Sequence, residues 1–192
     1  MQLRHLIPLL LLSTSATAFA DIIDINLRDN SAQLQYKSSM GRDALGNTEF
    51  HAGALYAGSD RFMADLGLLV KDELGGNAPG FSVGVGIKGV MAKVKDNASS
   101  TKNATAIALG AMVRYSPPSA PRAGIAGEFY LSPNITTFGD ADRYVEGAIR
   151  LEYEVIPAAV AYIGYRKVSL ALTNLPHANV DEGGYLGVRI SF

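Results

Sequence analysis

The chain has 192 residues, a formal net charge of −1 and no cysteine. This length suits one domain, and the charge argues against a nucleic-acid-binding protein, which is usually basic. The lack of cysteine fits an exported protein that does not depend on disulfides. After residue 20, no stretch approaches the roughly 18 uncharged apolar residues of a membrane-spanning helix, which excludes a helical membrane protein.

The first 20 residues predict a secretory signal. Arg4 and the amino group supply a positive start, Leu6 to Leu12 form a short apolar core, and Ala18-Phe19-Ala20 places small residues at a cleavage site. The apolar core is too short to span a bilayer as a helix, which needs roughly 20 residues. We therefore expect residues 1–20 to be removed after Sec-type export, and residues 21–192 to form one outer-membrane domain.

The rest of the chain consists of segments in which apolar and polar residues alternate. Most have roughly 9–15 residues, enough for a tilted strand to cross the hydrocarbon of a bilayer, and turn-forming residues separate them. The ten segments are Ile22–Arg28, Ser31–Ser38, Thr48–Ala57, Arg61–Lys71, Gly80–Lys95, Ala104–Tyr115, Ala120–Ser132, Ala141–Val155, Ala158–Leu170 and Gly183–Phe192.

This pattern predicts an all-β fold, a single antiparallel up-and-down transmembrane β-barrel of about ten strands. The alternative has eight strands, and in it Ile22–Ser38 stays outside the wall. No segment shows a sustained helical period, so we expect no helix after Ala20.

The last segment gives the clearest alternation. One face carries Leu186, Val188, Ile190 and Phe192, and the other carries Tyr185, Gly187, Arg189 and Ser191. A final strand of this kind is typical of an outer-membrane barrel, with apolar side chains toward lipid and polar ones toward the lumen. From the resemblance to other outer-membrane proteins, we expect Phe192 to be an assembly signal for the barrel-insertion machinery.

One segment changes its apolar face. In Gly80–Lys95, apolar residues first occupy odd positions, from Phe81 to Ile87, and then even positions, from Val90 to Val94. A β-bulge adds one residue to a strand and exchanges its two faces. The change of face therefore predicts a bulge near Lys88-Gly89.

If the last strand ends at the periplasm, the direction of every strand follows, and the aromatic residues fall into two bands. Such girdles at the two interfaces are typical of membrane barrels. The periplasmic band holds Tyr36, Phe81, Tyr115 and Tyr153, with Phe192, and the outer band holds Tyr56, Phe62, Phe129 and Tyr165. The same assignment places Asp96–Asn103, Pro133–Asp140 and Ala171–Glu182 outside as loops.

The faces opposite the apolar ones carry five basic and four acidic side chains. A selective pore and a salt-bridged core both fit this balance. The second is favoured, because a barrel of about eight strands has an interior only wide enough for side chains and an unpaired charge there is costly. The nine residues are Asp65, Lys88, Arg114, Glu128, Glu146, Arg150, Glu152, Arg166 and Arg189.

No motif predicts catalysis, a cofactor or a metal site. Gly84–Gly89 matches the dinucleotide-binding glycine pattern, but no helix follows to hold a pyrophosphate. His51 lies on the predicted lumen side, and His177, in a predicted outer loop, is the only candidate for a barrel enzyme acting on lipid. The other alternative, a soluble periplasmic lipocalin-like binding protein, would keep its apolar face inside the barrel.

Four segments resemble the YfaZ family of bacterial outer-membrane proteins. They are Gly127–Pro133, Tyr144–Tyr153, Tyr162–Arg166 and Gly184–Phe192. The resemblance implies a porin-like barrel in the outer membrane of a diderm bacterium, and it brings no substrate or catalytic residue with it. We therefore expect a small barrel, passive or structural, in contact with outer-membrane lipid. Its solute, if any, and its oligomeric state stay open.

Overall fold

The computed structural model describes residues 21–44, 46–58, 61–76, 78–95, 101–172 and 175–192. The predicted signal, residues 1–20, lies outside the described residues. The elements in chain order are β1 (Asp21–Leu27), β2 (Ser31–Asp43), β3 (Gly46–Ala57), β4 (Arg61–Glu73), β5 (Phe81–Lys95), β6 (Thr101–Tyr115), β7 (Ala123–Ser132), the 3-10 turn η1 (Asn134–Thr136), β8 (Thr137–Gly139), β9 (Ala141–Ile156), β10 (Ala159–Leu172) and β11 (Leu175–Ser191).

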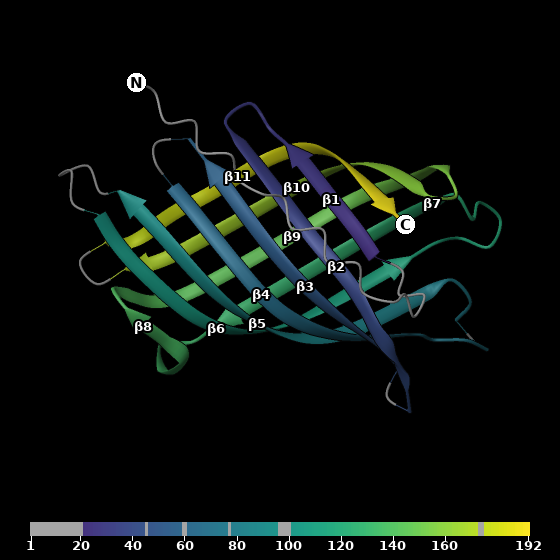
Figure 1. The fold of residues 1–192 in the computed structure, drawn as a ribbon, viewed down its shortest axis with the longest axis horizontal. Coiled ribbons are helices and arrows are strands. Elements are labelled where there is room, and N and C mark those ends of the chain that lie inside the picture. Colours follow the sequence, from purple (N-terminus) through teal and green to yellow (C-terminus); the bar gives the residue numbers. More distant parts are fainter. Residues whose placement is uncertain (1–20, 45, 59–60, 77, 96–100, 173–174) are drawn as a thin grey trace, which may run out of the picture.

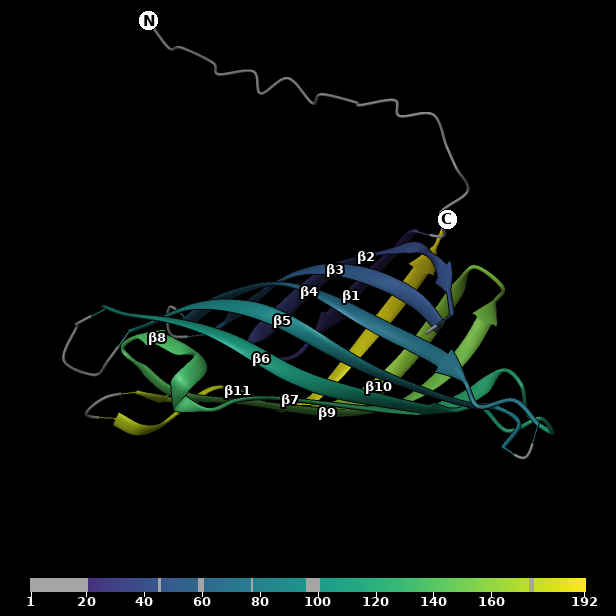
Figure 2. The same ribbon diagram turned by 90° about the horizontal axis from the view of Figure 1, so that it is seen from below.

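Ten of these strands form the wall of a closed antiparallel barrel (Figures 1 and 2). Neighbours in sequence pair with one another, β9 pairs with β7, and β1 pairs with both β2 and β11. Pairing of β5 with β6 along their whole length completes the ring. The predicted ten-stranded barrel is confirmed, and the eight-stranded alternative is wrong because β1 and β2 belong to the wall.

The first and last described residues, Asp21 and Phe192, meet at the barrel seam. The backbone nitrogen of Asp21 donates to the carbonyl of Phe192 at 3.0 Å, and that of Phe192 donates to the carbonyl of Asp21 at 2.9 Å. We call this end of the barrel the terminal end and the opposite one the far end. The seam is closed along the length of β1, which pairs with Leu186–Ser191 of β11, and this pairing covers the edge that an open sheet would expose there.

Two segments expected to be outer loops contain regular structure. Between Pro133 and Asp140 lie η1 and β8, and β8 pairs with Ala104–Ala106 of β6 beyond the end of β7. The expectation of no helix therefore missed one 3-10 turn. The expected loop Ala171–Glu182 is mostly strand, because β10 continues to Leu172 and β11 begins at Leu175. Most of the expected loop Asp96–Asn103 lies outside the described residues.

The predicted bulge near Lys88-Gly89 is wrong. Both neighbours of β5 keep an unbroken register through these residues, with Lys88 opposite Gly67 and Ala108. The even positions face inward along the whole strand, so Val90 and Ala92 are buried inside the barrel. The apolar residues change face because the interior itself becomes apolar toward the far end, and the strand is regular.

A bulge does occur where none was expected, between β10 and β11. Val168 is opposite Asp181 and Ser169 is opposite Asn179, which leaves Val180 as the extra residue. Both Val180 and Asp181 are consequently buried, with 1% and 4% of their surface exposed. One strand thereby adds an apolar and a charged side chain to the interior in succession.

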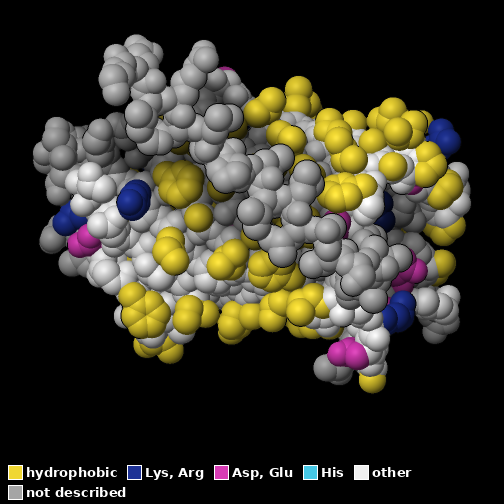
Figure 3. Space-filling model, in the orientation of Figure 1, with side chains coloured by type: hydrophobic (Ala, Val, Ile, Leu, Met, Phe, Trp, Pro, Cys, Tyr) yellow, Lys and Arg dark blue, Asp and Glu magenta, His cyan; other side chains and the backbone are white. Residues whose placement is uncertain are grey.

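The outside of the wall is apolar. Exposed large apolar side chains occur on every wall strand: Ile25, Leu34, Tyr56, Leu66, Val85, Leu109, Phe129, Leu151, Ile163 and Leu186 are examples, one from each. On the face shown in Figure 3, hydrophobic side chains spread over the middle and most charged ones lie toward the two ends. A protein in water does not normally expose so continuous an apolar surface, whereas a barrel in lipid requires it.

Glycines on the inner face make room for large side chains from neighbouring strands. A Cβ at Gly110 would overlap the ring of Tyr130, and one at Gly187 would overlap the ring of Tyr162. The Tyr185 ring covers Gly164 in the same way. An aromatic ring that packs over a strand glycine restores the contact that the missing side chain cannot make. These pairs fill the interior without widening the barrel.

Candidate functional site

The interior is the candidate site, and its far half is filled by apolar side chains. We call the following buried residues the apolar cluster: Leu55, Met63, Val90, Ala92, Val94, Ala104, Ala106, Ala108, Tyr130, Ala141, Tyr144, Val168, Leu170, Leu172 and Val180. They come from eight wall strands and have between 0% and 6% of their surface exposed. The polar lumen expected from the sequence thus occupies only the middle of the barrel and the half toward the terminal end.

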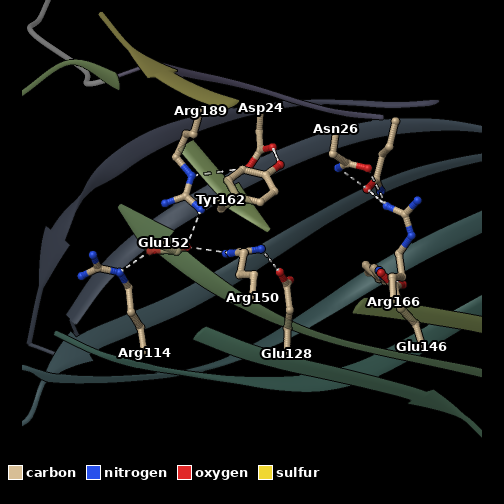
Figure 4. Close-up of polar contacts among 12 residues, drawn as sticks. Asp24, Asn26, Arg114, Glu128, Glu146, Arg150, Glu152, Tyr162, Arg166 and Arg189 are labelled. Atoms are coloured by element: carbon tan, nitrogen blue, oxygen red, sulfur yellow. Dashed lines mark hydrogen bonds and ion pairs between the residues drawn. The ribbon is translucent and has the colours of Figure 1, made fainter. Parts of the chain in front are cut away.

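Toward the terminal end, arginines and carboxylates form a connected network (Figure 4). Glu152 is its centre: Oε1 accepts from Arg150 at 2.7 Å and from Arg189 at 2.8 Å, and Oε2 accepts from Arg114 at 2.8 Å. Arg150 also pairs with Glu128. Because the Glu152 side chain is 1% exposed, its charge depends on these three guanidinium groups.

Asp24 extends the network to the first strand. It accepts hydrogen bonds from the Tyr162 hydroxyl and, at 3.4 Å, from Nε of Arg189. Arg189 therefore connects Asp24 of β1 with Glu152 of β9. Charged groups held by several partners in a low dielectric rigidify the interior when every member is satisfied.

A second network lies beside the bulge. Arg166 donates to a single oxygen of Asp181, Oδ2, from Nε at 2.9 Å and from Nη2 at 2.6 Å. Its Nη1 donates to Asn26 at 3.0 Å and also to Gln33. The charge-assisted bonds from Arg166 to Asp181 are the stronger ones in this group, because both partners are ionised. The bulged strand and the first two strands are thus joined across the interior.

A third group marks the boundary with the apolar cluster. Lys88 pairs with Glu146, which also accepts the Tyr144 hydroxyl. The Lys88 ammonium lies 4.1 Å from the centre of the Tyr130 ring, a cation–π contact. Two tyrosines of the apolar cluster therefore present their polar or electron-rich sides to the charges.

Asp65 is the least satisfied of the predicted residues. Both of its carboxylate oxygens are buried without a hydrogen-bond partner, and Nε2 of His51 lies 3.8 Å from Oδ1. Gly53 lies against the carboxylate, where a Cβ would be 2.6 Å from Oδ2. Buried carboxylates normally accept hydrogen bonds, so Asp65 is the strained member of the interior.

The cavity that lies among the interior networks is small. A cavity of about 10 Å³ lies among the two networks and is lined by residues such as Gln35, Glu128, Ala148 and Tyr185. That volume accommodates about one water molecule. Among the described residues that line this cavity, the packing leaves no space for a solute.

All nine charged residues predicted for the lumen face the interior. The structure joins Arg114, Glu128, Arg150, Glu152 and Arg189 in one network, and Lys88 with Glu146 in another. Arg166 instead pairs with Asp181, and Asp65 stands apart from both. The sequence analysis missed other buried polar residues, among them Asp24, Asn26, Gln33 and Asp181.

The missed residues had weak signals. Asp24 and Asn26 occupy alternate positions of the first predicted strand and could have been assigned from its period of two. Asp181 could not, because it was placed in a loop and only the bulge turns it inward. Alternation assigns faces within a strand, but it fails where a bulge shifts the phase.

The aromatic residues predicted for the girdles lie on the outer surface. Between 37% and 56% of the surface is exposed for Tyr36, Tyr56, Phe62, Phe81, Phe129, Tyr153 and Tyr165. Tyr115 is half-buried because it stacks on Phe81 with 4.3 Å between ring centres. Phe192 is 66% exposed at the terminal end.

Within the described residues, no cluster of three or more histidine, aspartate or glutamate side chains could hold a metal ion. The side chain of His177 lies outside the described residues. No helix among the residues described is long and apolar enough to cross a membrane.

An apolar exterior around a packed, ion-paired interior defines the class of small transmembrane β-barrels. A lipocalin-like protein would reverse the two surfaces. The family model described as YfaZ precursor matches residues 1–192. The chain belongs to the YfaZ family, and the predicted resemblance is confirmed.

Solved structures with a similar fold have low sequence identity to this chain. The KdgM porin is 11% identical, with 90% of this chain and 99% of that chain covered and a TM-score of 0.44. The NanC porin is 12% identical, with 91% and 99% covered and a TM-score of 0.41. A chain from work on in-meso crystallization of membrane proteins is 13% identical, with 91% and 83% covered and a TM-score of 0.47. A comparison with curated proteins gives no match.

Proposed function

We propose that this chain is a small porin-like barrel of the outer membrane that acts passively or structurally, and that its lumen is closed to solutes. The observation that supports closure is the apolar cluster, which fills the far half of the interior with side chains from eight strands. Water and ions avoid a packed apolar constriction, because no polar group replaces their hydration. The ion-paired networks occupy the remaining half.

The proposal places the terminal end in the periplasm and the far end outside. A barrel strand that carries the C-terminus ends at the periplasm in proteins of this class. The half-buried charges Arg114 and Glu128 then face the periplasm, whereas the apolar cluster lies toward the exterior. Closure is therefore asymmetric, and periplasmic water reaches part of the polar interior.

Export, lipid contact and assembly complete the proposal. The signal pattern of residues 1–20 supports Sec-type export, and the exposed apolar wall supports direct contact with outer-membrane lipid. Phe192, exposed at the terminal end, is the proposed contact for the barrel-insertion machinery. The interior networks hold every member in structural pairs, and this favours a non-enzymatic role.

Two measurements test the proposal. Cell fractionation with heat-modifiable gel mobility should place a folded barrel in the outer membrane, since closed barrels migrate differently before and after boiling. Planar-bilayer recording of the purified protein should show no stable open conductance. A soluble periplasmic product would overturn the location, and a large steady conductance would overturn the closed lumen and leave the porin-like barrel.

A further inference from the structure

Polar groups from three strands of the inner wall form no hydrogen bond with any other described residue. They are the side-chain amide of Gln35 on β2, Oε2 of Glu128 on β7 and the hydroxyl of Tyr185 on β11. Arg150 occupies only the other oxygen of Glu128, Oε1. Polar groups inside a protein are normally hydrogen-bonded to the protein or to ordered water, so these three groups require a further partner.

Gln35, Glu128 and Tyr185 line one cavity, the volume of about 10 Å³ that lies among the two networks. A volume of this size holds about one solvent-sized sphere, so the side chains that line it surround nearly a single point. Apart from Ala148, the other lining residues are buried, with between 1% and 9% of their surface exposed. The three unpartnered groups therefore share one small and mostly buried space.

The charges that line the cavity already compensate one another. Each lining carboxylate forms an ion pair with a cation, and each lining arginine forms an ion pair with a carboxylate. The pairs are Asp24 with Arg189, Glu128 with Arg150, Glu146 with Lys88 and Arg166 with Asp181. An ion in the cavity would add a charge without a partner, which is costly in a buried place. The occupant is therefore neutral and polar.

We propose that this cavity is a binding site for one water molecule, held by Gln35, Glu128 and Tyr185. Water suits all three groups, because it donates to the carboxylate of Glu128, accepts from the hydroxyl of Tyr185 and does either with the amide of Gln35. A buried water typically forms about three hydrogen bonds to groups that otherwise lack partners. A larger neutral ligand would exceed the volume.

The water connects the two networks drawn in Figure 4. Glu128 belongs to the network of Glu152 through Arg150. Tyr185 belongs to the other network, because the guanidinium of Arg166 lies 5.1 Å from the centre of its ring. A water between Glu128 and Tyr185 thus joins the interior from the bulge to the terminal half, and polar networks rigidify a core when every member is satisfied. This role goes beyond the proposed closure of the lumen.

Nuclear magnetic resonance of the full mature barrel in detergent micelles, with labelled alanine methyl groups, tests the proposal. Ala148 is the reporter, because its side chain lines the cavity. Its methyl group should show laboratory-frame and rotating-frame Overhauser effects of opposite sign to water, which is the signature of a long-lived bound water. Ala108 is the internal control: it is 0% exposed within the apolar cluster, so its methyl group should show no effect to water.

The Gln35→Met, Tyr185→Phe double variant removes two of the three partners at nearly constant volume. Its Ala148 effect should be lost, because a buried water requires at least two polar partners. Tyr153→Phe is the matched control on the outer wall, where Tyr153 is 55% exposed, and it should keep the effect. Heat-modifiable mobility of each variant shows that the barrel is folded.

Two results would overturn the water site. One is the lack of an Ala148 effect in the native protein, which needs no variant to fold. The other is an effect that persists in the folded double variant, because it would then come from exchanging side-chain protons. Water contact at Ala108 would instead contradict the closed lumen, so a failure of the water site differs from a failure of the proposed function.

Discussion

Ile149 and Arg150 are neighbours in β9 whose environments are opposite. Ile149 is 51% exposed on the outer wall, and Arg150 is 9% exposed inside, between Glu128 and Glu152. A period of two is enough to separate them, and the sequence assigned both faces of this strand correctly. At the residue scale, the loss of unfolding free energy caused by a substitution therefore depends first on whether the residue faces lipid or the interior, and then on its depth in the bilayer.

Ile149→Arg tests the lipid-facing surface. An arginine near the bilayer midplane should lower the free energy of unfolding by roughly 2–4 kcal/mol, and one near the interface by roughly 0–1 kcal/mol. Val155→Arg is the matched control, because Val155 lies on the same strand and face, close to the terminal end, with 55% exposed. Urea unfolding in lipid vesicles measures both. Equal costs would contradict a bilayer centred near Ile149.

Arg150→Ala tests the interior network. The change leaves Glu128 and Glu152 with fewer cations, and removing one partner of a buried pair typically costs about 3–5 kcal/mol. Arg42→Ala provides the comparison, because the Arg42–Asp72 pair is exposed and such pairs contribute roughly 0–1 kcal/mol. Unfolding free energies in the same vesicles should separate the two variants. Similar small losses would mean that the interior charges are well hydrated.

At the scale of the element, strand glycines and one bulge decide how the interior is filled. Alternation in the sequence predicted the ten strands, because period-two patterns survive wherever one face contacts lipid. It could not predict which inward glycine receives a ring, since Gly110 and Tyr130 come from different strands that pair only in the folded barrel. For the same reason it misread the apolar residues Val90–Val94 as a change of face.

Gly110→Ala tests the packing of a ring over a glycine. The added Cβ would overlap the Tyr130 ring and approach the Phe129 carbonyl at 2.6 Å. Overpacking of this kind typically costs about 1–3 kcal/mol. Gly147→Ala is the control, because its Cβ would meet its nearest neighbour, the Phe129 ring, at an ordinary 3.8 Å. If both variants unfold at the same urea concentration, Tyr130 must be able to move aside.

Deletion of Phe192 tests the closing strand. The residue pairs with Asp21 through two backbone hydrogen bonds and exposes its ring, so both the seam and the proposed assembly signal depend on it. The deletion should reduce the heat-modifiable, membrane-extracted form and leave misfolded protein in the periplasm. Phe192→Leu keeps the backbone hydrogen bonds to Asp21 but removes the aromatic ring. This variant therefore distinguishes the contribution of the backbone pairing from that of the ring. Native amounts of inserted protein after the deletion would contradict the role of Phe192.

At the scale of the whole molecule, the interior has two halves with different chemistry. The ion-paired half could be anticipated, because inward charges of both signs are visible in the alternation. The apolar cluster could not, because Leu55, Tyr144 and Leu170 look like ordinary strand residues until closure of the ring brings them together. A sequence with a polar lumen and one with an apolar end therefore share nearly the same pattern.

The two halves make different predictions for conductance. The Arg150→Ala, Glu152→Ala double variant removes charges from the terminal half and leaves the apolar cluster intact, so its conductance should stay at the native baseline. Tyr144→Ser with Leu170→Ser removes two fully buried side chains of the cluster and admits water to the far half, so it should leak. Planar-bilayer recording of proteins with confirmed heat-modifiable mobility compares them. An intact apolar cluster should still block hydrated ions in the Arg150→Ala, Glu152→Ala variant. If this variant conducts and the Tyr144→Ser, Leu170→Ser variant does not, the barrier to ions lies in the ion pairs and the proposed role of the apolar cluster is wrong.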